Sequence, residues 1–224
     1  MIDIKRLLDK PKVVSVVADV NQGKSMLLYD ILENACKEYN YNLYYYGLRL
    51  DFDKVNSQRI YSIAELEDIR DSVIIVDELS SLFDMDNRKI RKSIENTLRL
   101  INHNNNILIL CGVPENFKKF IAAKVDMVIY KKCTLADFVN GSVVKQRLLN
   151  YNGYERGTEL LNLLIDEAIF YDGKHYKKFN VKYYAKYDTK KSNQEILRLR
   201  KSSKKSSIKC GNNVHNKEIK KEVI

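Results

Sequence analysis

The residues best suited to chemistry lie between Ala18 and Met26, where the sequence reads ADVNQGKSM. This polar loop follows an apolar run and precedes a helical pattern, the order in which a strand, a phosphate-binding loop and a helix occur. Backbone N–H groups at the N-terminus of such a helix can surround phosphate oxygens, so we expect nucleotide binding here. The contacting residues are expected to be Asp19, Val20, Asn21, Gln22, Gly23, Lys24, Ser25 and Met26.

Two side chains of this loop have separate expected roles. Lys24 would reach the β- and γ-phosphates of ATP, and Ser25 would hold Mg²⁺. Where the motif has its first glycine, this chain has Ala18. Alanine narrows the accessible backbone conformations but removes no N–H group, so phosphate binding is still expected. The alternative is a chance Gly-Lys-Ser in a surface turn.

A pair of acids, Asp77 and Glu78, ends a second apolar run further along the chain. A buried parallel strand at Ser72–Val76 would deliver both carboxylates to the carboxyl edge of a sheet. We expect Asp77 to bind Mg²⁺, directly or through water, and Glu78 to polarise the attacking water. Acids also follow strands as helix N-caps, so this pair alone does not indicate a metal site. The phosphate loop that precedes it in the sequence is what favours the metal-binding interpretation.

Alternating helix and strand patterns surround these motifs. Helical periodicity is present in Met26–Tyr39, Ile63–Ile69 and Ile90–Ile101. Strands are predicted for Leu43–Leu50, Ser72–Val76, Ile107–Leu110 and Val125–Tyr130. Strands separated by helices form a parallel sheet that is covered on both faces.

The order of these elements narrows the fold class. Ile107–Leu110 comes one helix after the strand that carries Asp77, as in the additional-strand, RecA-like group of phosphate-loop ATPases. In that group the extra strand lies between the two motif strands. We therefore expect an α/β, three-layer P-loop NTPase with a mainly parallel central sheet and a small C-terminal extension. This arrangement favours ATP hydrolysis coupled to mechanical work.

Three segments are expected along the chain. Residues 1–133 would form the ATPase core, residues 134–187 a tyrosine- and lysine-rich extension packed on it, and residues 188–224 a basic, flexible tail. The tail has eleven Lys and Arg against four Asp and Glu, a net charge of +7 out of +10 for the whole chain. Such a tail can neutralise nucleic-acid phosphates, or it can serve only as a solubilising segment.

Within the extension, Leu160–Phe170 is expected to be a helix with Asp166 and Glu167 on its surface. A strand pair joined at Asp172–Gly173 follows it. Lys and Tyr side chains on these strands could contact nucleic acid, a second copy of the chain or the bound nucleotide. We expect a partner-facing extension of the same domain.

Composition excludes several classes of protein. The 224 residues are 45% hydrophobic and 30% charged, which is ordinary for a globular protein. No stretch approaches the roughly 20 apolar residues that cross a bilayer, and the N-terminal segment lacks a secretory apolar core. We expect a cytoplasmic protein. The four cysteines have no close-paired spacing, so neither a zinc site nor a disulfide framework is indicated.

The chain resembles the HerA/FtsK superfamily of DNA-pumping ATPases, which includes viral genome-packaging and filamentous-phage assembly ATPases. The resemblance covers residues 12–132 and rests on the Gly-Lys-Ser and Asp-Glu motifs described above, on His103 and Pro114, and on the strand that follows Lys124. It implies a Mg²⁺- and ATP-dependent motor that assembles as a homo-oligomeric ring. Its expected partner is double-stranded DNA, translocated during genome packaging by a virus or mobile element.

The resemblance also implies two further roles. In rings of this kind an arginine of one subunit stabilises charge on the phosphate bound by the next. The candidates are Arg88, Arg91 and Arg99, of which Arg88 and Arg91 lie three apart on one helical face, with a solvated basic face as the alternative. Where the family places a polar sensor of the γ-phosphate, this chain has Cys111-Gly112-Val113-Pro114. The nearest substitutes are Asn116 and the neighbourhood of Cys111.

Two other functions remain compatible with the sequence. One is a phosphate-loop kinase that transfers the γ-phosphate to a small acceptor, with the tyrosine-rich extension as its lid. The other is a nucleotide-gated adaptor that binds DNA or a partner without hydrolysis, which the missing sensor and the basic tail both favour.

Overall fold

A computed structural model of the chain describes residues 7–19, 21–38, 41–48, 57–77, 79, 88–113, 116–117, 119–132 and 159–183. The chain divides into two compact units, Met1–Tyr184 and Ala185–Ile224. All described residues belong to the first unit. The basic tail expected for residues 188–224 lies outside the described residues, as does the first half of the expected extension.

The described strands form one sheet in the order β3-β2-β4-β5-β1-β6-β7-β8. Their bounds are β1 Lys12–Val17, β2 Asn42–Tyr46, β3 Ser57–Arg59, β4 Ser72–Val76, β5 Ile107–Gly112, β6 Met127–Tyr130, β7 Glu167–Tyr171 and β8 Tyr176–Asn180. The first six strands are parallel, whereas β7 and β8 add to the edge in antiparallel pairing. The prediction that the extra strand lies between the two motif strands is confirmed, because β5 pairs with both β1 and β4.

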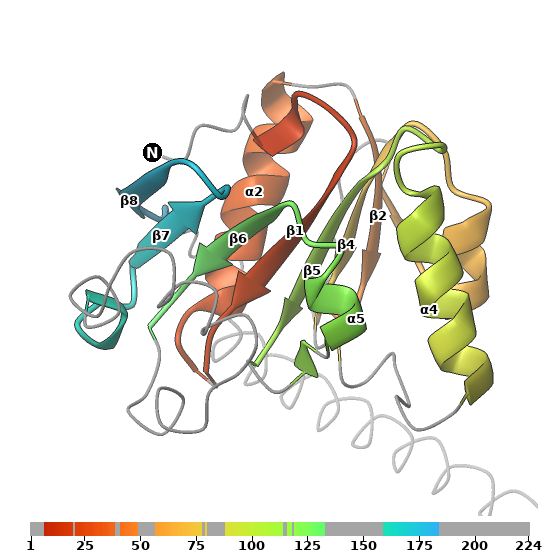
Figure 1. The fold of residues 1–224 in the computed structure, drawn as a ribbon. Coiled ribbons are helices and arrows are strands. Elements are labelled where there is room, and N and C mark those ends of the chain that lie inside the picture. Colours follow the sequence, from red (N-terminus) through yellow and green to blue (C-terminus); the bar gives the residue numbers. More distant parts are fainter. Residues whose placement is uncertain are drawn as a thin grey trace, which may run out of the picture. The chain divides into compact units, whose positions relative to one another are not determined.

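Helices cover both faces of this sheet, so the expected three-layer α/β architecture is confirmed. Helix α2 (Lys24–Glu38) crosses one face, while α4 (Arg88–Leu100) and the short α5 (Lys119–Ala122) stand against the other (Figure 1). A 3₁₀ helix, η1 (Ile63–Glu67), packs beside α4. The strands β1, β4 and β5 are buried throughout, which explains why their sequences are mostly apolar.

The sheet on the α4 side packs one cluster of buried side chains. Val13 and Val17 of β1 belong to it together with Ile94 and Leu98 of α4. Because side chains alternate along a strand, the intervening β1 residues face the α2 layer. Strand β1 is therefore packed on both faces, and its carboxyl end leads into the turn that precedes α2.

Two predictions about the elements are wrong. The strand expected over Leu43–Leu50 ends at Tyr46, because Gly47 turns the chain with φ of +77°. A side chain there would collide with the Asp77 carbonyl, whose oxygen lies 2.2 Å from the position of a Cβ. The helix expected over Leu160–Phe170 is also incorrect, since Glu167–Tyr171 is strand β7 and pairs with β6.

The expected turn at Asp172–Gly173 does join two strands, β7 and β8. Asp172 Oδ1 accepts hydrogen bonds from the N–H groups of Lys174 and His175, at 3.0 and 2.7 Å. Beyond β8, the N–H of Lys182 donates to Asp30 Oδ2 of α2 at 3.1 Å. The β7–β8 hairpin is therefore tied to the helix that follows β1.

Candidate nucleotide-binding site

The turn between β1 and α2, residues 18–23 and here called the β1–α2 turn, has two residues in the left-handed region of backbone conformation. Asn21 and Gly23 both have positive φ, +61° and +77°. The N–H of Leu27 donates to the Gly23 carbonyl at 3.1 Å, so the helix begins directly after this glycine. The first N–H groups of a helix have no acceptor within it, and no acid of the first turn of α2 offsets their partial positive charge. This geometry suits an anion.

Ala18 does not disturb the turn. Its side chain is fully buried, and its N–H donates to the Gly112 carbonyl at 3.3 Å, continuing the pairing between β1 and β5. It is not among the residues with positive φ, so its backbone needs no glycine. The missing glycine of the motif is therefore compatible with a phosphate-binding turn.

Side chains from the two motifs meet at this edge of the sheet. Ser25 Oγ donates a hydrogen bond to Asp77 Oδ2 at 3.3 Å, although 52 residues separate them. Asp77 directly follows β4 and is 5% exposed, and its N–H donates to the Tyr46 carbonyl at 2.9 Å. The Lys24 ammonium donates to the Asp19 carbonyl at 3.0 Å. The structure thus brings Lys24, Ser25 and Asp77 to one place, whereas Val20 and Glu78 lie outside the described residues.

The paired oxygens of Ser25 and Asp77 fit Mg²⁺. This ion favours oxygen ligands and usually retains water and phosphate oxygens in its coordination shell. Among the residues that the structure describes, no group of three or more His, Cys, Asp or Glu side chains gathers to hold a metal. A hydroxyl and a carboxylate are the donor set expected for a metal that arrives with a nucleotide.

The two candidates for the γ-phosphate sensor lie differently. A Cβ on Gly112, at the end of β5, would lie 3.3 Å from Asn116 Nδ2. The Asn116 amide therefore lies beside the last residue of β5, the strand between β1 and β4. Cys111 is fully buried within that strand. Asn116 is partly exposed whereas Cys111 is not, and a contact of either residue with a phosphate stays a prediction.

The candidate arginines lie on α4. Arg91 is exposed, and its Nε donates to Glu95 Oε1 at 3.1 Å, while its guanidinium carbon lies 4.9 Å from the centroid of the Phe120 ring. The side chain of Arg88 lies outside the described residues. A role for either arginine across a subunit boundary stays a prediction.

A buried lysine that sequence reasoning missed lies against the β1–α2 turn. Lys131 directly follows β6, and its N–H donates to the Val17 carbonyl at 2.9 Å. Its ammonium donates to the Ile165 carbonyl at 2.6 Å, and its side chain is fully buried. A Cβ on Gly23 would lie 2.8 Å from that carbonyl oxygen and 3.3 Å from Lys131 Cε. One signal was available, because Lys131 follows an apolar strand just as Asp77 does.

The surroundings of Lys131 perturb its ionisation. Burial lowers the pKa of its ammonium from 10.5 to about 8, and the nearby carboxylates of Asp166 and Glu167 oppose this shift. The N–H of Leu164, followed by the ammonium of Lys178, lowers the pKa of Glu167. A buried charge is costly, and such groups gather at functional sites more often than elsewhere.

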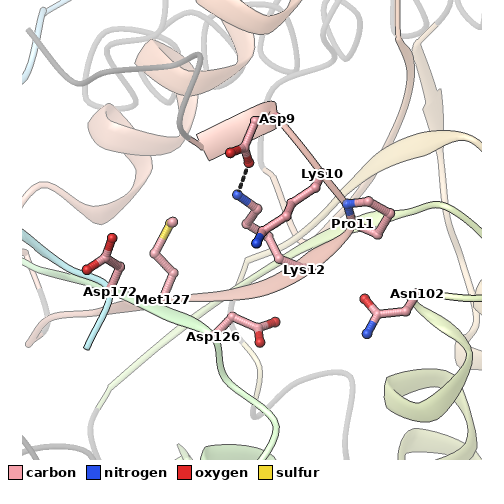
Figure 2. A pocket seen from close by; sticks show the side chains of 8 residues that line it. All are labelled: Asp9, Lys10, Pro11, Lys12, Asn102, Asp126, Met127 and Asp172. Carbon is pink, nitrogen blue, oxygen red and sulfur yellow. Dashed lines mark hydrogen bonds and ion pairs between the residues drawn. The ribbon is translucent and has the colours of Figure 1, made fainter. Parts of the chain in front are cut away.

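A hollow of about 650 Å³ opens at the opposite edge of the sheet. Figure 2 shows its lining, which comprises Asp9, Lys10, Pro11, Lys12, Asn102, Asp126, Met127 and Asp172. Its acids are engaged locally: Lys12 pairs with Asp9, and Asp126 Oδ2 accepts the Val13 N–H at 2.8 Å. This hollow lies where β1 and β6 begin, at the far end of both strands from the β1–α2 turn.

No described helix is both long and apolar enough to cross a membrane. Cys111 is a buried thiol.

No family model matches the chain, and no curated protein matches it. Similar solved structures do exist. B204, the DNA-packaging ATPase of Sulfolobus turreted icosahedral virus, matches with a TM-score of 0.58 and 14% identity, over 77% of this chain and 98% of B204. The genome-packaging NTPase B204 of Sulfolobus turreted icosahedral virus 2, in complex with ATP-γS, matches with a TM-score of 0.55 and 14% identity, over 77% and 97%.

EssC (ATPases 2 and 3) from Geobacillus thermodenitrificans matches with a TM-score of 0.54 and 13% identity, over 79% of this chain and 38% of EssC. Identities this low establish the fold alone. The fold expected from the sequence is confirmed at that level: the chain shares the α/β fold of these solved ATPases.

Proposed function

We propose that this chain binds Mg-ATP at the β1–α2 turn and hydrolyses it. The observation that carries the proposal is the contact of Ser25 Oγ with Asp77 Oδ2, at 3.3 Å, beside a turn with positive φ at Gly23. Two separate motifs meet where the fold class places a nucleotide. The virus 2 B204 protein, which shares this fold, has been solved with ATP-γS.

Each residue of the site has a distinct task in this proposal. The N–H groups at the start of α2 hold phosphate oxygens, and the Lys24 ammonium moves from the Asp19 carbonyl to the β- and γ-phosphates. Ser25 and Asp77 hold Mg²⁺, which when bound neutralises phosphate charge. The exchange at Lys24 is favourable because a charged phosphate is a stronger acceptor than a carbonyl.

Two further groups complete the proposed hydrolysis. Glu78, which follows Asp77 in sequence, orients the attacking water in line with the bond that breaks. Asn116 donates its amide to the γ-phosphate, in place of the polar side chain that Gly112 cannot supply. Its support is the 3.3 Å approach of Asn116 Nδ2 to a Cβ position at the end of β5.

We further propose that the ATPase assembles as a ring and translocates double-stranded DNA in genome packaging. The support is the likeness to B204, a viral DNA-packaging ATPase of which 98% is covered. The net charge of +10 favours a polyanionic partner. Arg91, exposed on α4, would exchange its ion pair with Glu95 for a neighbouring subunit's phosphate.

The direct test is ATP turnover with and without double-stranded DNA, together with the mass of the assembly. The proposal predicts Mg²⁺-dependent turnover that DNA stimulates, in a particle of several chains. Turnover in a monomer that ignores DNA would refute the motor but keep the ATPase. Transfer of phosphate to a nucleoside or another small acceptor would identify a kinase instead.

One observation favours a second candidate function. Gly112 ends β5 without a side chain, at the position where a sensor would discriminate ATP from ADP. A nucleotide-gated adaptor needs binding but no such sensor. Tight ATP binding without hydrolysis, with and without DNA, would select the adaptor.

A further inference from the structure

A short turn, Leu163–Asp166, contacts the β1–α2 turn from the far side of β6. The Ile165 carbonyl oxygen lies 2.8 Å from where a Cβ on Gly23 would be, and Ile165 Cγ1 lies 3.4 Å from the same point. Only glycine permits main chain to approach this closely. The contact is therefore specific to the glycine that precedes Lys24.

Hydrogen bonds hold this turn from several directions. The Lys131 ammonium donates to the Ile165 carbonyl at 2.6 Å, and the Val181 N–H donates to the Asp166 carbonyl at 2.6 Å. Glu167 closes the turn on itself: its N–H donates to the Leu164 carbonyl at 3.0 Å, and its Oε2 accepts the Leu164 N–H at 2.9 Å. A turn fixed in this way is preorganised, so binding a ligand costs it little conformational entropy.

The rigid turn displays two large aliphatic side chains. Leu164 is 62% exposed and Ile165 is 59% exposed, and they are two of four exposed large hydrophobic residues among the described part of the chain. These two neighbouring side chains on a fixed turn provide a small apolar surface, here called the apolar patch. This patch adjoins the β1–α2 turn, so its natural occupant is the remainder of a molecule whose phosphates lie there.

We propose that Leu164 and Ile165 form the seat for the nucleoside of the bound nucleotide, and that Lys131 is the positioning residue that holds this seat against Gly23. This inference rests on the proposed function, because it needs a phosphate at the β1–α2 turn. The flat face of a nucleobase is apolar and matches two aliphatic side chains. The seat contacts the apolar face of the base, and its two aliphatic side chains form no hydrogen bonds with the polar edge.

The test compares two ligands that share phosphates but differ in the nucleoside: ATP and inorganic tripolyphosphate. Calorimetry on the full chain, with Mg²⁺, measures both affinities for the wild type and for the double variant Leu164→Ser/Ile165→Ser. We expect the variant to lose about tenfold or more in ATP affinity, near 1.4 kcal/mol, and to keep its tripolyphosphate affinity. Tyr61→Ser removes an exposed aromatic next to β3, at the other end of the strand order, and should change neither affinity.

Lys131→Met provides a second arm. A positioning role predicts weaker ATP binding with tripolyphosphate binding retained, a split that a general loss of stability would not produce. Unchanged ATP affinity in the double variant, or equal loss for both ligands, overturns the nucleoside seat. In that case a change in the mass of the assembly would assign the patch to a second copy of the chain. A wild-type protein that binds neither ligand would refute the proposed function as well.

Discussion

Replacing Lys131 with methionine should remove a pH dependence of stability that the wild-type chain has. The pKa of the buried ammonium is lowered from 10.5 to about 8, so the folded state binds the proton more weakly than the unfolded state does. Below pH 8 the ammonium is protonated in both states, so the folded state bears the full free-energy cost of burying its charge. Between pH 8 and 10.5 the unfolded state binds more protons, so the unfolding free energy rises with pH.

The size of the effect follows from the shift. A displacement from 10.5 to about 8 corresponds to about 3 kcal/mol over the whole interval. Only part of it is gained by pH 9, where the same linkage gives about 1 kcal/mol relative to pH 7. Methionine keeps the length of the stem but cannot titrate. At pH 7 the lost hydrogen bond to Ile165 and the relief of the buried charge oppose each other.

Urea unfolding at pH 7 and pH 9 measures the effect, with the wild type and Lys131→Met compared at each pH. The difference between the two proteins isolates Lys131, because other groups titrate in both. We expect this difference to move by about 1 kcal/mol in favour of the wild type at pH 9. Lys132→Met, at the exposed neighbour, should show no such movement. A difference that stays constant between the two pH values would show that the ammonium is solvated, and would refute the reasoning.

Three further changes test the site. Gly23→Ala should weaken ATP binding about tenfold or more, as measured by calorimetry. A non-glycine residue at φ of +77° is strained by about 1–2 kcal/mol, and its methyl group would also approach the Ile165 carbonyl. Glu78→Gln should bind ATP and fail to turn it over, which a phosphate-release assay measures; unchanged turnover removes its proposed role. Asn116→Ala should lower kcat more than ATP affinity, and an equal change in both would indicate a purely structural amide.

The first of these changes has a matched control. Gly173 also has a positive φ, +90°, but a Cβ there would meet nothing within 4 Å. Gly173→Ala therefore carries similar backbone strain without the collision, at the opposite edge of the sheet. Equal losses of ATP affinity in Gly23→Ala and Gly173→Ala would show that strain alone, transmitted through stability, explains the effect.

The central part of the fold could be predicted because its signals are local. The polar turn before Lys24 and the apolar run before Asp77 each indicate one strand and where it ends. Parallel strands end at a common edge, so the proximity of Ser25 and Asp77 follows from the fold class. The roles assigned to these residues stay predictions until nucleotide binding is measured.

The part that could not be predicted depends on contacts between distant segments. Residues 167–170 are predicted as part of a helix but belong to β7, because a short, buried apolar segment has no periodicity that separates a helix from a strand. Its pairing with β6 places Ile165 against Gly23 and buries Lys131 between them. The sequence spacing does not predict this contact, although Lys131 follows an apolar strand just as Asp77 does.

The affinity of the chain for Mg-ATP with and without the Lys24 ammonium tests the central claim most directly. Titration calorimetry on the wild type, Lys24→Ala and the control Lys92→Ala, an exposed lysine on α4, provides the comparison. If the β1–α2 turn holds the triphosphate, Lys24→Ala loses measurable ATP binding while Lys92→Ala matches the wild type. Full ATP affinity in Lys24→Ala would place the nucleotide elsewhere and contradict the account.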